Sequence, residues 1–252
     1  METIAIVTGA SSGMGEEFCK QLDSKGLDSI SLVARRKELM ESIADSLKTS
    51  TRIFAMDLTD RSCIDSLLDI VANERPNIRY LVNCAGFGKF GMTWELPRET
   101  TRSMIDLNVC ATVDITDGCI PFMENGGHII ELDSASAYIP MYYLNIYAST
   151  KAFVKHYCNA LRLELKDKGI TVTEVSPGWV KTEFIDITVT ENNVPPRVFN
   201  GAVTKEDVVR KALIAADKGK KRSVCGIKNK LIVSISYHFP GLASRLWKGF
   251  FH

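Results

Sequence analysis

The chain has 252 residues, of which 45% are hydrophobic and 24% are charged, the composition of an ordinary globular protein. Its formal net charge of +1 gives no overall field that would favour nucleic acid or an anionic membrane as a partner. The seven cysteines are scattered, with no Cys-x-x-Cys pair and no histidine cluster nearby, so we expect a reduced, cytoplasmic protein that binds no metal.

Short apolar segments alternate with amphipathic segments of helix length, which is the pattern of a parallel sheet with helices on both faces. Strands are predicted over residues 3–8, 29–34, 52–56, 79–83, 128–132 and 170–175, with an edge strand over 222–225. Helices are predicted from the turn after the first strand to about residue 25, and over 37–48, 61–74, 98–122, 147–168 and 205–218. Asp60 is the predicted N-cap of the third helix. The sequence therefore predicts one doubly wound α/β domain over residues 1–252.

Two segments do not follow this alternation, residues 183–203 and 226–252. The first holds paired prolines and paired asparagines, and long loops of this kind usually close a functional site or are disordered. The second is an apolar and basic tail, which could pack on the domain, roof a substrate pocket or meet a second subunit. It could instead lie on a membrane surface, although packing is the preferred interpretation. We expect no membrane span and no signal peptide, since no run of about 18 apolar residues occurs and a strand-like segment follows Met1 almost at once.

A glycine-rich turn follows the first strand and leads into a helix, with the spacing Gly-x-x-x-Gly-x-Gly. Glycines at such positions let the backbone turn sharply and approach a pyrophosphate, whose charge then lies at the helix N-terminus. The turn could be an ordinary connection, but its place directly after the first strand favours dinucleotide binding. The residues predicted to contact the cofactor here are Gly9, Ser11, Ser12, Gly13, Met14 and Gly15.

The end of the second strand indicates which nicotinamide cofactor would be bound. An acidic residue there would bind the ribose hydroxyls and repel a 2′-phosphate, but this chain has Ala34 followed by Arg35 and Arg36. Arginine forms bidentate, charge-assisted bonds to phosphate. NADP(H) is therefore favoured over NAD(H), with Arg35 as the stronger candidate, unless both arginines are only a solvated start to the next helix.

Tyr147 and Lys151 are four residues apart, so on a helix they lie on the same face. An ammonium group beside a phenol stabilises the phenolate and lowers the phenol pKa from its usual value of about 10. Such a tyrosine could give or take a proton during carbonyl and alcohol interconversion. Alone, the pair could equally be a packing tyrosine and a solvated lysine.

Together these motifs resemble the short-chain dehydrogenase/reductase family, and the resemblance runs from residue 3 to about residue 182. It implies a Rossmann fold with a mostly parallel seven-stranded sheet, an NAD(P)-dependent enzyme acting on CH–OH groups, and a homodimer or homotetramer. Further positions match the family's cofactor-binding motifs: Asp57 and Leu58 against the adenine, Asn83, Ala85 and Gly86 after the fourth strand, and Pro177, Gly178, Val180 and Thr182 around the nicotinamide carboxamide.

The resemblance also implies a catalytic set of Asn108, Ser134, Tyr147 and Lys151. Tyr147 would protonate the carbonyl oxygen, and Ser134 would orient that oxygen where negative charge develops. Lys151 would bond the nicotinamide ribose and depress the tyrosine pKa, while Asn108 would connect Lys151 to solvent through a water molecule.

Three residues depart from the family pattern. Cys84 replaces a second asparagine, and Glu131 and Asp133 flank the end of the fifth strand, where small or apolar residues are more usual. Asp133 is interpreted either as a turn former or as a charge near the substrate entrance, and the turn is preferred.

The substrate is expected to be a sizeable hydrophobic carbonyl or alcohol, such as a hydroxysteroid or bile acid, because large apolar side chains surround the predicted centre. These are Phe90, Trp94, Tyr138, Met141, Tyr142 and Trp179. An acyl or small carbonyl substrate is the alternative. A non-catalytic dinucleotide sensor remains a competing class because fold does not fix function, and a sugar-nucleotide epimerase would need a larger C-terminal domain.

Overall fold

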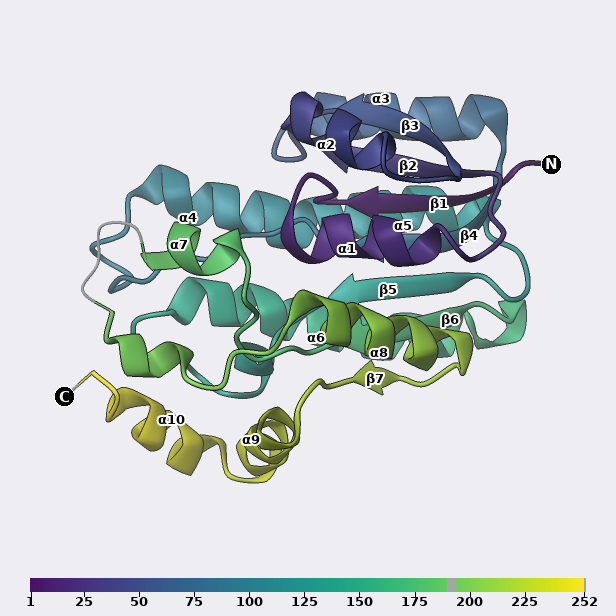
Figure 1. The fold of residues 1–252 in the computed structure, drawn as a ribbon. Coiled ribbons are helices and arrows are strands. Elements are labelled where there is room, and N and C mark those ends of the chain that lie inside the picture. The colour runs from purple at the N-terminus through teal and green to yellow at the C-terminus, as the bar shows by residue number, and fades with distance from the viewer. Residues whose placement is uncertain (190–193, 252) are drawn as a thin grey trace.

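The sheet determines where the site lies. The structure, a computed structural model, describes residues 1–189 and 194–251, and it contains a seven-stranded sheet in the order β3-β2-β1-β4-β5-β6-β7 (Figure 1). Every strand pair in it is parallel, which confirms the predicted doubly wound Rossmann fold. From β1 the chain adds strands outward to β3 on one side, and from β4 it adds them outward to β7 on the other. Ligands of open α/β sheets bind outside the carboxyl ends of the strands at such a switch point.

The strands are β1 (Thr3–Thr8), β2 (Ser29–Ala34), β3 (Ser50–Ala55), β4 (Asn77–Asn83), β5 (His128–Leu132), β6 (Thr171–Val175) and β7 (Arg222–Ser223). The α-helices are α1 (Gly13–Leu22), α2 (Lys37–Ala44), α3 (Arg61–Glu74), α4 (Arg98–Ile105), α5 (Ala111–Cys119), α6 (Asn145–Glu164), α7 (Glu183–Val189), α8 (Lys205–Asp217), α9 (Ile227–His238) and α10 (Pro240–Lys248). Asp60 caps α3 as predicted, since its carboxylate accepts a hydrogen bond from the Ser62 amide at 2.9 Å.

Both faces of the sheet are buried, which explains why its central strands are almost continuously apolar. Successive side chains of a strand point to opposite faces, so Ala5 and Val7 join one core while Ile4 and Ile6 join the other. Helices α1, α2 and α8 complete the first core, and α3, α5 and α6 complete the second. Each layer therefore holds the strands in a fixed register.

The segment predicted as a helix over residues 98–122 is helical throughout, but it is not one regular α-helix. A π-helical turn, Asp106–Cys110, separates α4 from α5, and a 3-10 turn, Ile120–Phe122, ends the segment at Pro121. A π turn is a bulge within a helix that stays helical on both sides, so the sequence predicts one continuous helix.

Other boundaries also differ from the predictions. Strand β3 begins two residues earlier, β4 begins at Asn77, and α2 ends at Ala44. The segment 183–203, predicted to be irregular, contains α7 and a 3-10 turn, Pro196–Phe199, while residues 190–193 lie outside the described residues. The tail forms α9 and α10, which lie below the sheet in Figure 1. No helix in the described part of the chain is long and apolar enough to cross a membrane.

Candidate active site

In the turn after β1, backbone segments approach each other so closely that two positions require glycine. Gly9 has a left-handed φ of +67°, and a Cβ on it would lie 2.9 Å from the Ala85 amide nitrogen. A Cβ on Gly15 would lie 2.1 Å from the Gly9 carbonyl oxygen, so the first turn of α1 also needs glycine. Thr8 Oγ1 accepts hydrogen bonds from the Cys84 and Ala85 amides at 3.0 and 3.1 Å and so joins the ends of β1 and β4. The result is a narrow cradle of the kind that admits a pyrophosphate.

The two arginines after β2 lie beside this turn. Arg36 donates hydrogen bonds to Ser12 Oγ at 2.6 Å and to Glu183 at 3.0 Å. The Arg35 side chain is 73% exposed and its guanidinium is 3.9 Å from the carboxylate of Asp57, which follows β3. Because β1, β2 and β3 are adjacent and parallel, the predicted cofactor residues that follow them lie together at the carboxyl end of the sheet.

A buried polar network joins β4, α5 and β5. Asn83 donates to Thr116 at 2.8 Å and to Glu131 at 2.9 Å, and Thr116 donates to the same carboxylate oxygen at 2.9 Å. Burial raises the pKa of Glu131 to about 7, although these two hydrogen bonds oppose the shift. Glu131, unexpected in the sequence, is therefore the partner of Asn83.

Tyr147 and Lys151 lie on α6 as predicted, and both are buried. The Lys151 ammonium is 5.9 Å from the Tyr147 ring centroid and donates its hydrogen bond to the Leu132 carbonyl at 2.6 Å. The expectation that Lys151 lowers the tyrosine pKa is wrong for this structure. Burial raises the Tyr147 pKa, and only the Ser134 hydroxyl acts in the opposite direction among the causes resolved. Burial also lowers the pKa of Lys151.

Asn108 lies in the π turn and is fully buried. Its side chain donates to the Phe87 carbonyl at 2.9 Å and to Thr150 Oγ1 at 3.1 Å, and it accepts from the Phe87 amide at 3.0 Å. It thus joins the loop after β4 to α6, beside Lys151. Its role in a water-mediated proton path stays a prediction.

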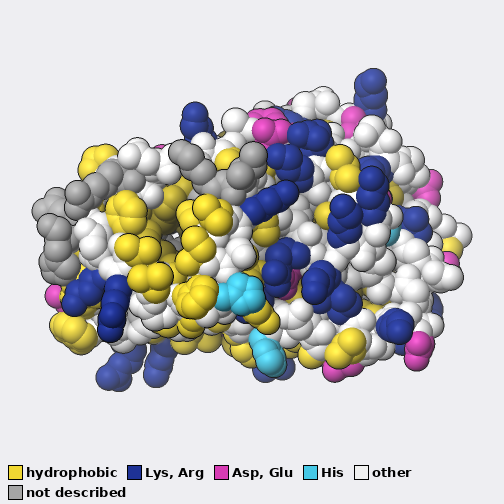
Figure 2. Space-filling view, turned by 90° about the horizontal axis from the view of Figure 1, so that it is seen from below, with side chains coloured by type: hydrophobic (Ala, Val, Ile, Leu, Met, Phe, Trp, Pro, Cys, Tyr) yellow, Lys and Arg dark blue, Asp and Glu magenta, His cyan; other side chains and the backbone are white. Residues whose placement is uncertain are grey.

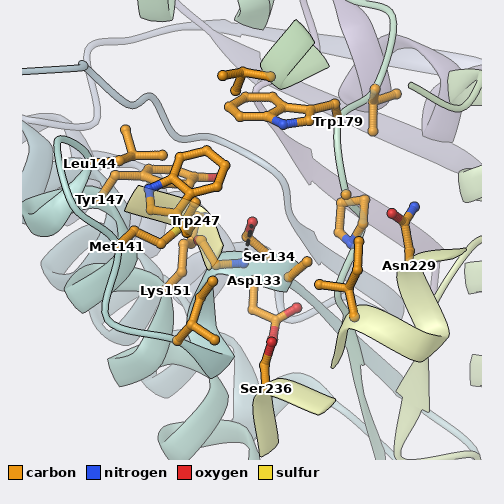
Figure 3. Close-up of a pocket in the computed structure, with 18 of the residues that line it drawn as sticks. Asp133, Ser134, Met141, Leu144, Tyr147, Lys151, Trp179, Asn229, Ser236 and Trp247 are labelled. Atoms are coloured by element: carbon orange, nitrogen blue, oxygen red, sulfur yellow. Dashed lines mark hydrogen bonds between the residues drawn. The ribbon is translucent and has the colours of Figure 1, made fainter. Parts of the chain in front are cut away.

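A cavity of about 870 Å³ opens above these groups, and its lining is mostly apolar (Figure 3). Many residues predicted for cofactor, catalysis or substrate line it: Met14, Gly86, Ser134, Met141, Tyr147, Lys151, Pro177, Gly178, Trp179, Val180 and Thr182. Leu58 is buried in the core, and the remaining predicted cofactor residues lie along the strand ends outside this lining.

Four residues predicted to contact substrate do not line this cavity. Phe90 is fully buried in the neighbouring aromatic cluster, and the Tyr138 hydroxyl donates to Glu174 at 3.0 Å. Trp94 is 80% exposed and lines, with Tyr142, a separate cavity of about 450 Å³. Aromatic residues close to the site in sequence thus serve the core or a second surface hollow.

Part of the tail, residues 226–252, forms one wall of the cavity. The sequence did not predict which of its side chains do so. Side chains from α9, α10 and the residues after them line the cavity: Asn229, Ile232, Ile235, Ser236, Ala243, Arg245, Leu246, Trp247 and Phe250. Figure 2 shows hydrophobic side chains gathered around a hollow on this face, with Lys and Arg side chains nearby. Composition marked the tail as apolar and basic but gave no indication of which side chains face inward.

Asp133 does not act as a simple turn former. It is 3% exposed and lines the cavity, and neither of its carboxylate oxygens has a hydrogen-bond partner among the described residues. Burial, reinforced by the charge of Glu174, raises its pKa to about 8, while Ser176, Lys151 and Arg222 act in the opposite direction. The preferred interpretation as a turn former is therefore wrong. The alternative of a charge near the substrate entrance fits in position, since Asp133 lines the cavity, but its raised pKa keeps it uncharged at neutral pH.

This buried carboxyl should make folding stability depend on pH. The folded-state pKa of about 8 exceeds the usual value of 3.8, so the folded chain holds its proton more tightly and stability falls as pH rises between these two values. We expect Asp133→Asn to remove this loss of folding stability with rising pH. At the upper end of this pH range the variant should be more stable than wild type by roughly 1–3 kcal/mol. Melting temperatures measured across the range would show it, and parallel curves for the two proteins would contradict it.

Comparison with known proteins agrees with this geometry. A sequence profile described as short chain dehydrogenase matches residues 3–193. An uncharacterized oxidoreductase of Staphylococcus epidermidis is 35% identical over 187 residues, which is 73% of this chain and 81% of that protein. A protein named serine 3-dehydrogenase from Rhizobium radiobacter is 30% identical over 186 residues, 73% of this chain and 74% of that protein.

Solved structures agree in the fold. The closed form of a serine dehydrogenase complexed with NADP+ has a TM-score of 0.77 at 28% identity, covering 87% of this chain and 94% of that one. A short-chain dehydrogenase from Sphingobium yanoikuyae in complex with NADPH has a TM-score of 0.78 at 24% identity, covering 97% and 95%. The motif order, the parallel sheet and these matches lead to one conclusion: the chain belongs to the short-chain dehydrogenase family, and it is an oxidoreductase.

Proposed function

We propose that this enzyme interconverts a secondary alcohol and a ketone on a large hydrophobic substrate, with NADP(H) as its cofactor. The observation that carries the proposal is the position of Ser134, Tyr147 and Lys151 at one side of a mostly apolar cavity of about 870 Å³. A buried phenol whose pKa is raised stays protonated at neutral pH, which is the form that donates a proton during ketone reduction.

The residues of this chain fit a nicotinamide dinucleotide. The cradle of Gly9 and Gly15 would admit the pyrophosphate, Lys151 would hold the ribose of the nicotinamide, and the strand-end residues would hold the adenosine. When bound, the cofactor supplies or accepts a hydride. Tyr147 then donates a proton to the carbonyl oxygen or accepts one from the alcohol, and Ser134 donates a hydrogen bond to the same oxygen.

Two observations support NADP(H) over NAD(H). Arg35 and Arg36 follow β2 in the place where an acidic residue would repel a 2′-phosphate. The 28% identical serine dehydrogenase structure is a complex with NADP+. We propose cytoplasmic location and a homodimer or homotetramer on the family resemblance, with one domain over residues 1–252.

The relative named serine 3-dehydrogenase makes a small hydroxy acid the second candidate substrate. An amino acid would leave most of the cavity unfilled, and the apolar side chains of α9 and α10 would have no partner. A steroid-sized or bile-acid-sized molecule fills such a space and covers that wall, so it is the preferred class.

A cofactor-oxidation screen tests both halves of the proposal. We expect turnover with steroid or bile-acid ketones and NADPH, and we expect Arg35→Ala to raise KM for NADPH about tenfold or more with little change for NADH, because a charge-assisted phosphate bond is lost. Lys48→Ala, at the opposite edge of the sheet just before β3, is the control and should change neither KM. Turnover of small polar ketones alone, or an equal loss with both cofactors, would contradict the proposal.

A further inference from the structure

Asp133 and Ser236 line the cavity and have no hydrogen-bond partner among the described residues. Asp133 directly follows β5, and both of its carboxylate oxygens are buried and unpaired. Ser236 lies on α9, is 1% exposed, and its hydroxyl is also buried and unpaired. Both residues line the same cavity, and Figure 3 shows their side chains pointing toward each other from the sheet and from the tail helix.

Such groups are costly unless something completes their hydrogen bonds. A buried polar atom without a partner loses its interaction with water and gains nothing in return, so buried side chains of this kind are nearly always paired. In the surrounding polar cluster, Tyr138 donates to one oxygen of Glu174 at 3.0 Å, and Arg222 donates to the same carboxylate. The other Glu174 oxygen and the Ser136 hydroxyl are buried without a partner among the described residues. Asp133, Ser136 and Ser236 therefore line the cavity with unpaired buried atoms, and Asp133 and Ser236 point toward each other across it.

We propose that Asp133 and Ser236 form a polar subsite that binds a second hydroxyl group of the substrate, apart from the carbon that Tyr147 and Ser134 act on. The inference rests on the proposed function and narrows its substrate class to a hydrophobic hydroxyketone or diol. A neutral hydroxyl can donate to the Asp133 carboxyl and accept from Ser236, which completes both groups without burying a new charge.

The position of Asp133 limits where that hydroxyl lies in the substrate. Asp133 and Ser134 are consecutive, and consecutive Cα atoms are about 3.8 Å apart. Both side chains are short and line one cavity, so a fused-ring substrate whose carbonyl oxygen meets Ser134 can reach Asp133 with a hydroxyl on a neighbouring ring.

An ammonium group is the competing ligand, and the surroundings disfavour it. Lys151 and Arg222 both act on Asp133, so positive charge is already present around it. A cation would also lose its hydration on entering an apolar cavity, at a much greater cost than a hydroxyl would. A substrate carboxylate at this position would face Asp133 and Glu174, and it would be repelled.

The test uses three probes that share one ring system: a ketosteroid with a hydroxyl on the ring next to the ketone ring, its deoxy parent, and the corresponding amine. Dissociation constants are measured on the full-length enzyme with its cofactor bound, from quenching of tryptophan fluorescence, since Trp179 and Trp247 line the cavity. Turnover is measured in parallel. We expect wild type to bind the hydroxylated ketone about tenfold or more tightly than the deoxy parent, as two hydrogen bonds to buried groups require.

The variants assign this preference to the subsite. Asp133→Leu should reduce the ratio of the two dissociation constants about tenfold or more, and Ser236→Ala should reduce it severalfold. Ser234→Ala, on the same helix but exposed, is the matched control for Ser236, and Glu131→Gln is the control for loss of another buried carboxyl. Ser236→Ala is a small change that keeps the test valid if Asp133→Leu fails to fold.

Several outcomes would overturn the inference: equal binding of the two ketones by wild type, a ratio unchanged in both subsite variants, a control that shifts the ratio equally, or tightest binding of the amine. A loss common to both ketones with a raised KM for NADPH would place Asp133 at the cofactor instead. If wild type binds the pair with the expected preference but reduces neither ketone, the proposed function fails while the subsite stands.

Discussion

Tyr147→Phe is expected to lower kcat for ketone reduction by about 10²–10⁴-fold, because the variant lacks the only proton donor placed beside the carbonyl oxygen in the proposed mechanism. The ring itself should stay in place. It packs at 5.6 Å from the Phe184 ring, and a Cβ on Gly88 would lie 2.9 Å from it, so the pocket is shaped around an aromatic residue. NADPH affinity should therefore change little. Stopped-flow measurement of the reduction step, with a separate titration of NADPH, distinguishes the two effects.

A second tyrosine on the same helix provides the control. Tyr157 lies further along α6, and its hydroxyl donates to Asp117 at 3.1 Å, away from the cavity. Tyr157→Phe removes the same atom and should leave kcat within a factor of about three, since loss of one exposed hydrogen bond affects stability more than chemistry. Turnover by Tyr147→Phe at the wild-type rate would show that the proton comes from another group.

Trp247→Ala should raise KM for hydrophobic ketones about tenfold or more and lower kcat much less, because replacing a buried aromatic residue by alanine removes several kcal/mol of packing. Trp247 is 9% exposed, and its indole nitrogen donates to the Tyr142 carbonyl at 2.8 Å. It therefore holds α10 against the loop before α6. Without it, the wall formed by the tail should open, while Ser134 keeps its place after β5 and Tyr147 its place on α6.

The chain contains a matched tryptophan for comparison. Trp94 is 80% exposed and lies outside the large cavity, so Trp94→Ala should leave KM nearly unchanged. Initial rates over a range of ketone concentrations separate KM from kcat for both variants. Equal effects of the two substitutions would mean that the tail does not shape the substrate site.

The strand-end motifs were predictable because each is tied to a local feature that survives in sequence. A glycine turn follows β1, two arginines follow β2, and Ser134 follows β5, so parallel pairing alone brings them to one edge. The spacing of Tyr147 and Lys151 likewise fixes them on one helical face. These relations depend on chain geometry and not on the packing of distant elements.

Other features depended on contacts that no local pattern records. Burial raises the pKa of Tyr147, and residues distant in sequence pack around it, such as Phe184 of α7 and Trp247 of α10. The sequence around Asp133 favours a turn former, but its side chain is buried in the cavity lining with no partner among the described residues, and local sequence does not show such burial. Trp94 and Tyr142 were assigned to the substrate on their aromatic character, which does not show the direction in which a side chain points.

The wall contributed by α9 and α10 has a consequence for how specificity could diverge among relatives. The profile shared with the family ends at residue 193, whereas this wall comes from residues after 226. In the proposed mechanism, the residues that transfer the proton lie within that profile, whereas part of the apolar wall of the cavity lies beyond it. Mutations in the final helices could exchange one ketone for another without disturbing Ser134, Tyr147 or Lys151, and the same chemistry could be inherited while its target changes.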